Sequence, residues 1–410
     1  MRVFYFLLFA VLFICGCSSG DSESPPVKIN TGAMALSGGN PRDWATGSMI
    51  HPNTYIKETT QNKFLRQSLF TPVCSDTTGI LMNPPEIIYQ TDVNGRNGAS
   101  ELRSSKRDVV FPAKDRGYLS GPEGGKYPYK SGGKVSFTFL SGTLPVTYQT
   151  YACFFNLDNP GDYHVLPASI RDVRTTAVND NYIVFSEYTK GIWIYTTNLV
   201  LVKQIKTHTQ PSSWCPVISA NNDIVAFSSC AMSGSTDIYK QREIYVYDIS
   251  LALLRRITLD PNAAMVEPSI SADGSKIAFL RSPEVNGQYN TIQVARINSD
   301  GTGYQIIDPD GYNLNVKINA LGDTIAWSHN NNVLVDHGYF VRIWQNGTTR
   351  NLTSNDKQNI WIDIDDSGKW VTYAKEEGYW SDFQIRMISA AYNNDYLICD
   401  SQYWDTYPAL

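Results

Sequence analysis

The chain has 410 residues, of which 42% are hydrophobic and 12% aromatic, which is enough apolar material for a large core. It carries 34 Lys and Arg residues against 39 Asp and Glu residues, a formal net charge of −5. This balance builds no basic surface, so it argues against nucleic acid as a partner and against binding to anionic lipid through charge.

The first 16 residues are predicted to be a lipoprotein signal peptide. Arg2 precedes the apolar run from Val3 to Ile14, which has the length of a signal-peptide core and is too short to cross about 30 Å of hydrocarbon as a helix. The sequence from Ile14 to Ser18 resembles the bacterial lipobox, in which a small residue precedes the cysteine that is acylated. The resemblance implies that Cys17 carries the lipid anchor, with palmitate among the expected acyl chains. The alternative is an ordinary cleaved signal that leaves Cys17 as a plain thiol.

Residues 17–50 are predicted to be a flexible tether, because Ser18 to Pro26 contain no apolar residue able to join a core. Residues 51–167 are predicted to be a divergent β region. Its expected elements are an outer blade hairpin from Glu86 to Arg103 turning at Asn94-Gly95, a strand from Lys134 to Phe139, and the outer hairpin of a further blade from Val146 to Leu166 turning at Asn159 to Gly161. The stretch from Gly117 to Gly133 is expected to be a long loop.

Residues 168–410 contain a four-stranded unit that is repeated. The clearest copy runs from Glu267 to Ile307, where Asp273-Gly274 and Asp300-Gly301 separate short apolar runs and can supply the positive φ angles of tight hairpin turns. One aromatic residue marks each copy, and the steps between successive ones are 42, 52, 48 and 46 residues: Phe185, Phe227, Phe279, Trp327 and Tyr373. A period of about 40 to 50 residues with four strands per unit is typical of propeller blades.

The run from Pro268 to Phe279 reads Pro-x-Ile-Ser-x-Asp-Gly-x-x-Ile-Ala-Phe, and it resembles the TolB-type (PD40, WD40-like) repeat. The resemblance covers about Ala168 to Cys399 and implies an all-β propeller of four-stranded blades. If residues 51–167 supply two divergent blades, the total is seven, which is favoured over six. The alternative is a separate small β-domain before a six-bladed ring. TolB belongs to a cell-envelope complex and binds a lipoprotein partner, but this chain shows no recognisable TolB amino-terminal α/β domain, so only the fold is carried over.

The tail, Ser401 to Leu410, is expected to pair with amino-terminal material, because propellers commonly close by joining strands from both chain ends in one blade.

Export makes disulfide bonds possible, and Cys215 and Cys230 form the predicted pair. In a hairpin turning near Asn222, positions whose numbers sum to about 445 lie opposite each other, which aligns these two cysteines. Directly opposed residues have Cβ atoms about 4.5 to 5.5 Å apart, near bridging range. Cys74, Cys153 and Cys399 are left without an assigned pairing.

Residues 51–410 contain no nucleophile elbow, no His-Glu-x-x-His zinc motif, no phosphate-binding glycine loop and no Cys-x-x-Cys pair. We therefore expect no catalytic residues, no metal and no cofactor. His329 and His337 lie in one polar segment beside Asp336, a group that suits a metal or an acid-base site. The preferred interpretation is a polar loop with exposed histidines.

In the expected blade order, the loops between second and third strands and those between blades open on one face, where propeller ligands usually lie. Aromatic, carboxylate and imidazole side chains there can stack on sugars or anchor a peptide. The candidate ligand-binding residues are Trp214, Glu267, His329, Asp336, His337, Trp361, Trp380 and Asp382.

The sequence thus predicts a lipid-anchored lipoprotein of the bacterial cell envelope, at the outer membrane and facing the periplasm or the cell surface. Its propeller is expected to bind a protein or peptide partner rather than to catalyse a reaction. The alternative is a glycan-binding protein or a polysaccharide lyase or hydrolase, with His329 and His337 at a site on the propeller face.

Overall fold

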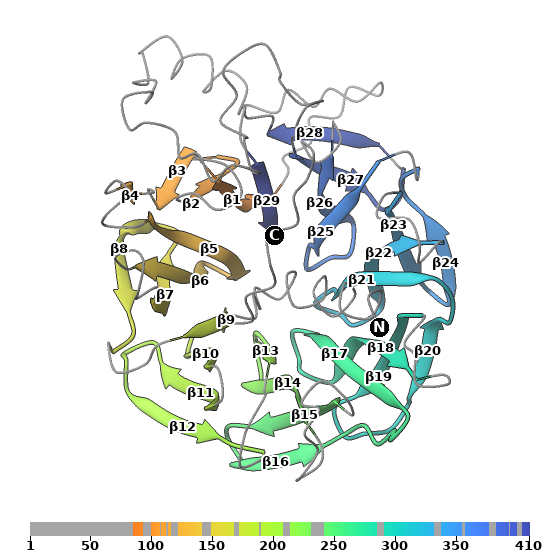
Figure 1. Ribbon diagram of the computed structural model, residues 1–410, viewed down its shortest axis with the longest axis horizontal. Helices are drawn as coiled ribbons and strands as arrows, with labels where there is room; N and C mark the ends of the chain where they lie inside the picture. The colour runs from red at the N-terminus through yellow and green to blue at the C-terminus, as the bar shows by residue number, and fades with distance from the viewer. Residues whose placement is uncertain are drawn as a thin grey trace, which may run out of the picture.

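The computed structural model describes residues 85–410 apart from gaps at 93–99, 107, 112–113, 116–121, 142–148, 168–171, 188–189, 208–213, 231–241, 285–290, 332–337, 355–356, 377–382, 393 and 400–403. The described residues form seven antiparallel sheets arranged around one axis, so the fold is a seven-bladed β-propeller (Figure 1). The expected all-β class and the favoured blade number are both confirmed.

Blades 3 to 7 each use four consecutive strands, with the first strand nearest the axis and the last outermost (Figure 1). Blade 3 contains β9 (Val173–Val178), β10 (Tyr182–Glu187), β11 (Gly191–Thr196) and β12 (Leu201–Ile205). Blade 4 contains β13 (Trp214–Ile218), β14 (Ile224–Cys230), β15 (Arg242–Asp248) and β16 (Leu253–Arg256). Blade 5 contains β17 (Ala263–Ile270), β18 (Lys276–Pro283), β19 (Gln293–Asn298) and β20 (Gln305–Asp308). Blade 6 contains β21 (Tyr312–Ile318), β22 (Thr324–Asn330), β23 (Phe340–Gln345) and β24 (Thr348–Asn351). Blade 7 contains β25 (Asn359–Ile364), β26 (Trp370–Glu376), β27 (Phe383–Ser389) and β28 (Asp395–Cys399).

Blade 1 closes the ring with strands from both ends of the described chain. It contains β1 (Ile88–Asp92), β2 (Ser100–Ser104) and β3 (Asp108–Phe111), with β29 (Trp404–Ala409) as the innermost strand (Figure 1). The pairing of β29 with β1 is antiparallel, with Ile88 opposite Ala409 and Gln90 opposite Thr406. The expected pairing of the tail with amino-terminal material is therefore confirmed, and this pairing closes the ring.

Blade 2 contains β5 (Pro122–Ser131), β6 (Lys134–Ser141), β7 (Gln149–Asn156) and β8 (Asn159–Val165), and the short β4 (Lys114–Asp115) pairs with β5. The prediction of a long loop from Gly117 to Gly133 is wrong over most of its length, because Pro122–Ser131 form β5, the innermost strand of the blade. Pairing with β6 overrides the low strand propensity of its glycines. The β7–β8 hairpin turns at residues 157–158, earlier than expected, since Asn156 already faces Asn159. The pairing of β1 with β2 confirms the expected hairpin, but its place as the outer hairpin of a blade is wrong, because these are the middle strands of blade 1. The expected turn at Asn94-Gly95 lies outside the described residues.

The aromatic residues that mark the repeat occupy equivalent places. Each is the fourth residue of the second strand in its blade and is fully buried: Phe185 in β10, Phe227 in β14, Phe279 in β18, Trp327 in β22 and Tyr373 in β26. The side chains of the second and third strands pack against those of the next blade, as where Phe279 joins one cluster with Ala226, Ile244 and Val246. The core is thus a series of apolar layers between blades.

Candidate binding site at the propeller axis

Six of the seven innermost strands carry a β-bulge opposite the buried aromatic residue of the second strand. In each bulge one non-glycine residue has a positive φ angle, between 49° and 54°. We call these six residues the axial ring: Tyr127, Cys215, Glu267, Asn315, Trp361 and Tyr407. Figure 1 shows their strands, β5, β13, β17, β21, β25 and β29, around the axis of the propeller. The same backbone feature is therefore repeated at the centre of the molecule.

The bulge conformation is unfavourable for the residues that adopt it. A positive φ angle costs a non-glycine residue about 1–3 kcal/mol, and the residue before a proline is further restricted. Glu267 precedes Pro268 and Tyr407 precedes Pro408, yet both have φ near 50°. Glycine would relieve this strain, yet none of the six positions is glycine. Bulges commonly redirect a side chain in this way beside functional sites.

Neighbouring members of the axial ring contact one another from blade to blade. The backbone N–H of Asn315 donates to Oε2 of Glu267 at 3.2 Å, and the backbone N–H of Trp361 donates to Oδ1 of Asn315 at 2.9 Å. The ring centroid of Trp361 lies 4.9 Å from that of Tyr407, which lies 4.8 Å from that of Tyr127. Five blades are thus linked through ring side chains. Asn315, Tyr407 and Tyr127 were not among the residues expected from sequence.

Two polar atoms of the axial ring are buried without a hydrogen-bond partner in the described structure: Oε1 of Glu267 and Nε1 of Trp361. Both residues are more than nine-tenths buried. Native proteins leave few such groups, because an unsatisfied buried polar atom costs about 1–3 kcal/mol. Burial raises the pKa of Glu267 to about 7, although the Asn315 N–H and the charge of Lys317 act in the opposite direction. The carboxyl group is therefore poised between its neutral and charged forms at neutral pH.

A second layer of polar side chains lies two residues beyond the axial ring on the same strands. Nζ of Lys317 lies 3.5 Å from Oδ1 of Asp363, which joins blade 6 to blade 7. The other oxygen, Oδ2 of Asp363, accepts the backbone N–H of Leu410 at 2.9 Å. The positive charge of Lys317 is thus held by Asp363.

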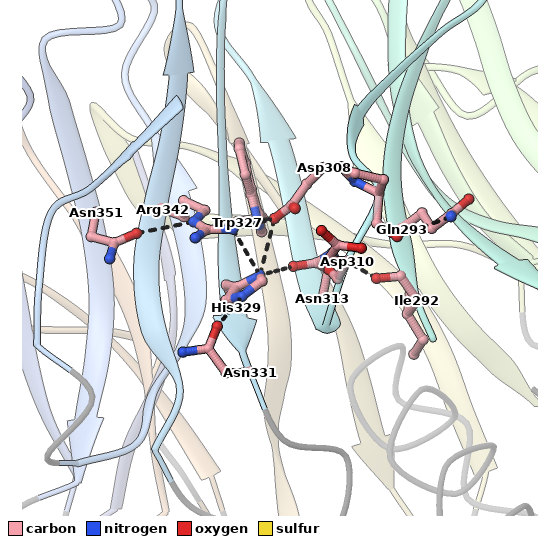
Figure 2. Close-up of polar contacts among 11 residues, drawn as sticks. Ile292, Gln293, Asp308, Asp310, Asn313, Trp327, His329, Asn331, Arg342 and Asn351 are labelled. Atoms are coloured by element: carbon pink, nitrogen blue, oxygen red, sulfur yellow. Dashed lines mark hydrogen bonds and ion pairs between the residues drawn. The ribbon is translucent and has the colours of Figure 1, made fainter. Parts of the chain in front are cut away.

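His329 is not in the exposed loop that was expected from sequence. It lies within β22 and is 2% exposed, because strand pairing continues to Asn330 (Figure 2). Its Nδ1 lies 2.7 Å from Oδ1 of Asn313 and 3.0 Å from Oδ2 of Asp308, and its Nε2 lies 2.9 Å from Oδ1 of Asn331. Both ring nitrogens are therefore occupied by protein oxygens.

Asp308 is the centre of this polar cluster, which joins blade 5 to blade 6 (Figure 2). Its Oδ2 accepts hydrogen bonds from Nε1 of Trp327 and from Nη1 of Arg342, both at 2.9 Å, and it also contacts His329. Burial opposes the charged form, but the hydrogen bonds and charges of His329 and Arg342 outweigh it and lower the pKa of Asp308. The cluster is therefore a junction between blades in which the carboxylate of Asp308 is paired with hydrogen-bond donors.

Asp308→Asn is expected to reduce the free energy of unfolding by about 2 kcal/mol at pH 7, because hydrogen bonds to a charged group contribute about 1.5–3 kcal/mol. A carboxyl group whose pKa is lowered by folding stabilises the protein above its unfolded pKa of about 3.9, and that contribution is lost as pH falls through the folded value. The difference between wild type and variant should therefore narrow below about pH 4. Urea unfolding of both proteins from pH 7 to pH 3 measures the difference in their free energies of unfolding. A difference that does not change with pH would contradict a stabilising charge on Asp308.

Gly311→Ala is expected to destabilise the protein more than Gly347→Ala does. Both glycines have positive φ angles, at 76° and 82°, so both variants carry the same type of backbone strain. A Cβ atom at residue 311 would lie 2.6 Å from Cε1 of His329 and 2.7 Å from the carbonyl oxygen of Asn330, whereas one at residue 347 meets no atom within 4 Å. Overpacking adds about 1–3 kcal/mol. Equal thermal melting temperatures for the two variants would show that His329 and Asn330 move away from the added methyl group at little cost in stability.

Trp214, the other described residue of the predicted set, is not a member of the axial ring. Trp214 begins β13 and is buried, and the guanidinium carbon of Arg242 lies 4.0 Å from the centroid of its ring. This cation–π contact gives Trp214 a packing role within blade 4. Asp336, His337, Trp380, Asp382 and Cys17 lie outside the described residues. Of the eight predicted ligand-binding residues, the structure brings Glu267 and Trp361 into one ring.

The predicted Cys215–Cys230 disulfide is wrong. Cys215 is disulfide-bonded, but Cys230 takes no part in a disulfide. The bulge at Cys215 changes the register, since Trp214 faces Ser228 and Val217 faces Ala226, so Cys230 lies beyond the level of Cys215. Cys153, which had no assigned partner, is a buried free thiol, and burial raises its pKa.

Within the part of the chain that the structure describes, no three His, Cys, Asp or Glu side chains converge in a way that could hold a metal ion. The same residues include no helix of the length and apolarity needed to cross a membrane.

No protein-family model and no curated protein matches the sequence. Among solved structures, the chain is similar to the β-propeller domain of the trilobed protease from Pyrococcus furiosus, with a TM-score of 0.52, 12% identity, and coverage of 69% of this chain and 86% of that one. It is also similar to acylaminoacyl peptidase from Pyrococcus horikoshii, with a TM-score of 0.50, 12% identity, and coverage of 70% of this chain and 46% of that one. TolB from Acinetobacter baumannii matches with a TM-score of 0.44, 16% identity, and coverage of 70% and 81%. At these identities the likeness is one of fold alone, and the fold of this chain is a seven-bladed β-propeller.

Proposed function

We propose that this protein binds a protein or peptide partner in the bacterial cell envelope through its axial ring and the adjoining face. The observation that carries the proposal is the pair of buried polar atoms without partners, Oε1 of Glu267 and Nε1 of Trp361, at equivalent places around one axis. Both sit on strained backbone that glycine would relax, and strain of this kind concentrates at functional sites. A partner that supplies a hydrogen-bond donor and an acceptor would satisfy both atoms.

The proposed location follows from the amino-terminal sequence. Cleavage before Cys17 and its acylation would leave the propeller on a tether of residues 17–50, held at the outer membrane and facing the periplasm or the cell surface. Cys17→Ser is expected to move the protein from the membrane fraction to the soluble fraction. A variant that still sediments with membranes would show that the anchor lies elsewhere.

Site-specific photo-crosslinking in intact cells tests the binding face. Asp310 and Leu321 are both exposed and lie at opposite ends of β21, Asp310 just before the strand and Leu321 in the turn after it. A photoreactive residue at 310 lies on the proposed binding face, and one at 321 is its matched control. The proposal requires a discrete cross-linked species from position 310 and none from position 321. Cross-linking from position 321 alone, or from neither position, would contradict the proposed binding face.

Glycan binding is the second candidate function, and the aromatic contacts of Trp361, Tyr407 and Tyr127 favour it, because sugars stack on such faces. A metal-dependent lyase using His329 has less support, since both nitrogens of that ring are held by protein oxygens. Calorimetric titration with acidic and neutral oligosaccharides, with a uronate-lyase absorbance assay beside it, separates glycan binding from partner binding.

A further inference from the structure

The charge of Glu267 is not balanced by direct contact with any cation among the described residues. Its Oε2 accepts one hydrogen bond, from the backbone N–H of Asn315, and its Oε1 accepts none. The residue is only 8% exposed. A buried carboxyl group in this situation is satisfied either by a proton or by a cation brought to it.

Lys317 is the cation whose charge acts on Glu267, and it is already engaged. Its ammonium group lies 3.5 Å from Asp363, whose charge also acts on Lys130 of β5, and Lys317 is the only cation whose charge is found to act on Glu267 among the described residues. Because Lys317 is held by Asp363, the carboxylate of Glu267 favours a cationic group of its own, and the low dielectric of the interior strengthens that attraction.

An arc of aromatic side chains completes the axial ring on its other side. Trp361, Tyr407 and Tyr127 are in sequential contact, with centroid separations of 4.9 Å and 4.8 Å. Such rings offer flat apolar area, and Nε1 of Trp361 adds one donor that has no acceptor among the described residues. The ring thus presents an acidic side on blade 5 and an apolar side on blades 7, 1 and 2.

We propose that the axial ring recognises a positively charged nitrogen of the bound peptide, held by the carboxylate of Glu267, with an apolar side chain of the same peptide on the Trp361–Tyr407–Tyr127 arc. The nitrogen belongs to a lysine side chain or to a free amino terminus, since both are primary ammonium groups. This inference rests on the proposed function, because it specifies the chemistry of the partner segment.

Three synthetic dipeptides test the proposal by calorimetry at pH 7.5: acetyl-Phe-Lys-amide, acetyl-Phe-norleucine-amide, and Phe-norleucine-amide with its free amino group. Norleucine keeps the lysine side chain without its charge. The expected result is that one of the two charged peptides binds about tenfold or more tightly than the neutral one, as a charge-assisted hydrogen bond requires. Which charged peptide binds identifies the source of the nitrogen. Affinity is expected to fall as pH is lowered to 6, because protonation of Glu267 removes the attraction.

Glu267→Gln preserves the shape of the side chain and should abolish the preference for charge. Glu243→Gln is the matched control, because Glu243 is also buried but its carboxylate accepts hydrogen bonds from Thr258 and from the backbone of Asp260, outside the axial ring. Equal binding of the charged and neutral peptides, absence of binding by any of them up to millimolar concentration, or an unchanged preference in Glu267→Gln would overturn the inference. The photo-crosslink from position 310 tests the proposed function separately. If that cross-link forms but calorimetry shows no preference for charged peptides, only this inference is contradicted.

Discussion

Deletion of residues 404–410 is expected to abolish cooperative folding of the propeller. These residues contain β29, the innermost strand of blade 1, which pairs with β1 and packs against β25 and β5 of the neighbouring blades. Without β29, the inner edge of β1 and the apolar surfaces of two blades face water. The loss is about 5 kcal/mol or more, which approaches the whole stability of a typical domain. Size-exclusion chromatography and urea unfolding measure it.

A point variant separates ring closure from mere truncation. Ala409 lies in β29 and is buried in the cluster that contains Ile88, Leu102 and Phe137. Ala409→Asp places a charge in that apolar cluster and should produce most of the effect of the deletion. Tyr392→Asp, at a residue that is 77% exposed in an outer turn, is the control and should change stability by less than about 0.5 kcal/mol. A deletion variant that unfolds like the wild type would mean that the ring holds without its closing strand.

The repeat could be predicted from sequence because its signals are local. Asp273-Gly274 and Asp300-Gly301 fix two hairpin turns, and the apolar run ending at Phe279 indicates the buried second strand. The structure places both pairs in turns and gives each turn glycine a positive φ angle. Local turn chemistry and strand burial therefore agree, and five blades are readable without any long-range information.

The two amino-terminal blades were harder to read because their pairing is not local. In blade 1 the innermost strand comes from the far end of the chain, and in blade 2 it is the glycine-rich β5. A signal was nevertheless present. Tyr89 and Phe137 are buried in β1 and β6 at places equivalent to Phe185, and successive members of this trio are 48 residues apart. Extending the aromatic period backwards would have located both blades.

The candidate site was only partly predictable for a related reason. Glu267 and Trp361 were selected as loop residues, whereas they belong to innermost strands and reach the axis because of bulges. A bulge is decided by pairing between strands, so sequence periodicity does not reveal it. The same kind of local shift in register explains why Cys230 was wrongly predicted to be the disulfide partner of Cys215. A proline directly after the ring residue, as in Tyr127-Pro128 and Tyr407-Pro408, is the sequence signal that could have marked the ring.

Truncation of the buried aromatic residue in blade 6 is expected to be among the most damaging single substitutions in the described core. Trp327 is fully buried in the largest core cluster, beside Ile325, Val341 and Ile343, and its indole N–H donates to Asp308. Trp327→Ala removes this packing, leaves a cavity between blades and withdraws one hydrogen bond from a buried carboxylate. A loss of about 3–5 kcal/mol in the free energy of unfolding is expected.

Trp327→Phe distinguishes the packing contribution from the polar one. Phenylalanine occupies the equivalent places in blades 3, 4 and 5, at Phe185, Phe227 and Phe279, so this variant suits the backbone and keeps most of the apolar volume. It should cost less than Trp327→Ala, with the remaining deficit coming from the lost donor to Asp308, which His329 and Arg342 still contact. Urea unfolding of the two variants beside wild type gives both differences. If Trp327→Phe were as unstable as Trp327→Ala, the hydrogen bond to Asp308 would outweigh the apolar packing, and the blade junction would depend on its polar cluster more than on its aromatic core.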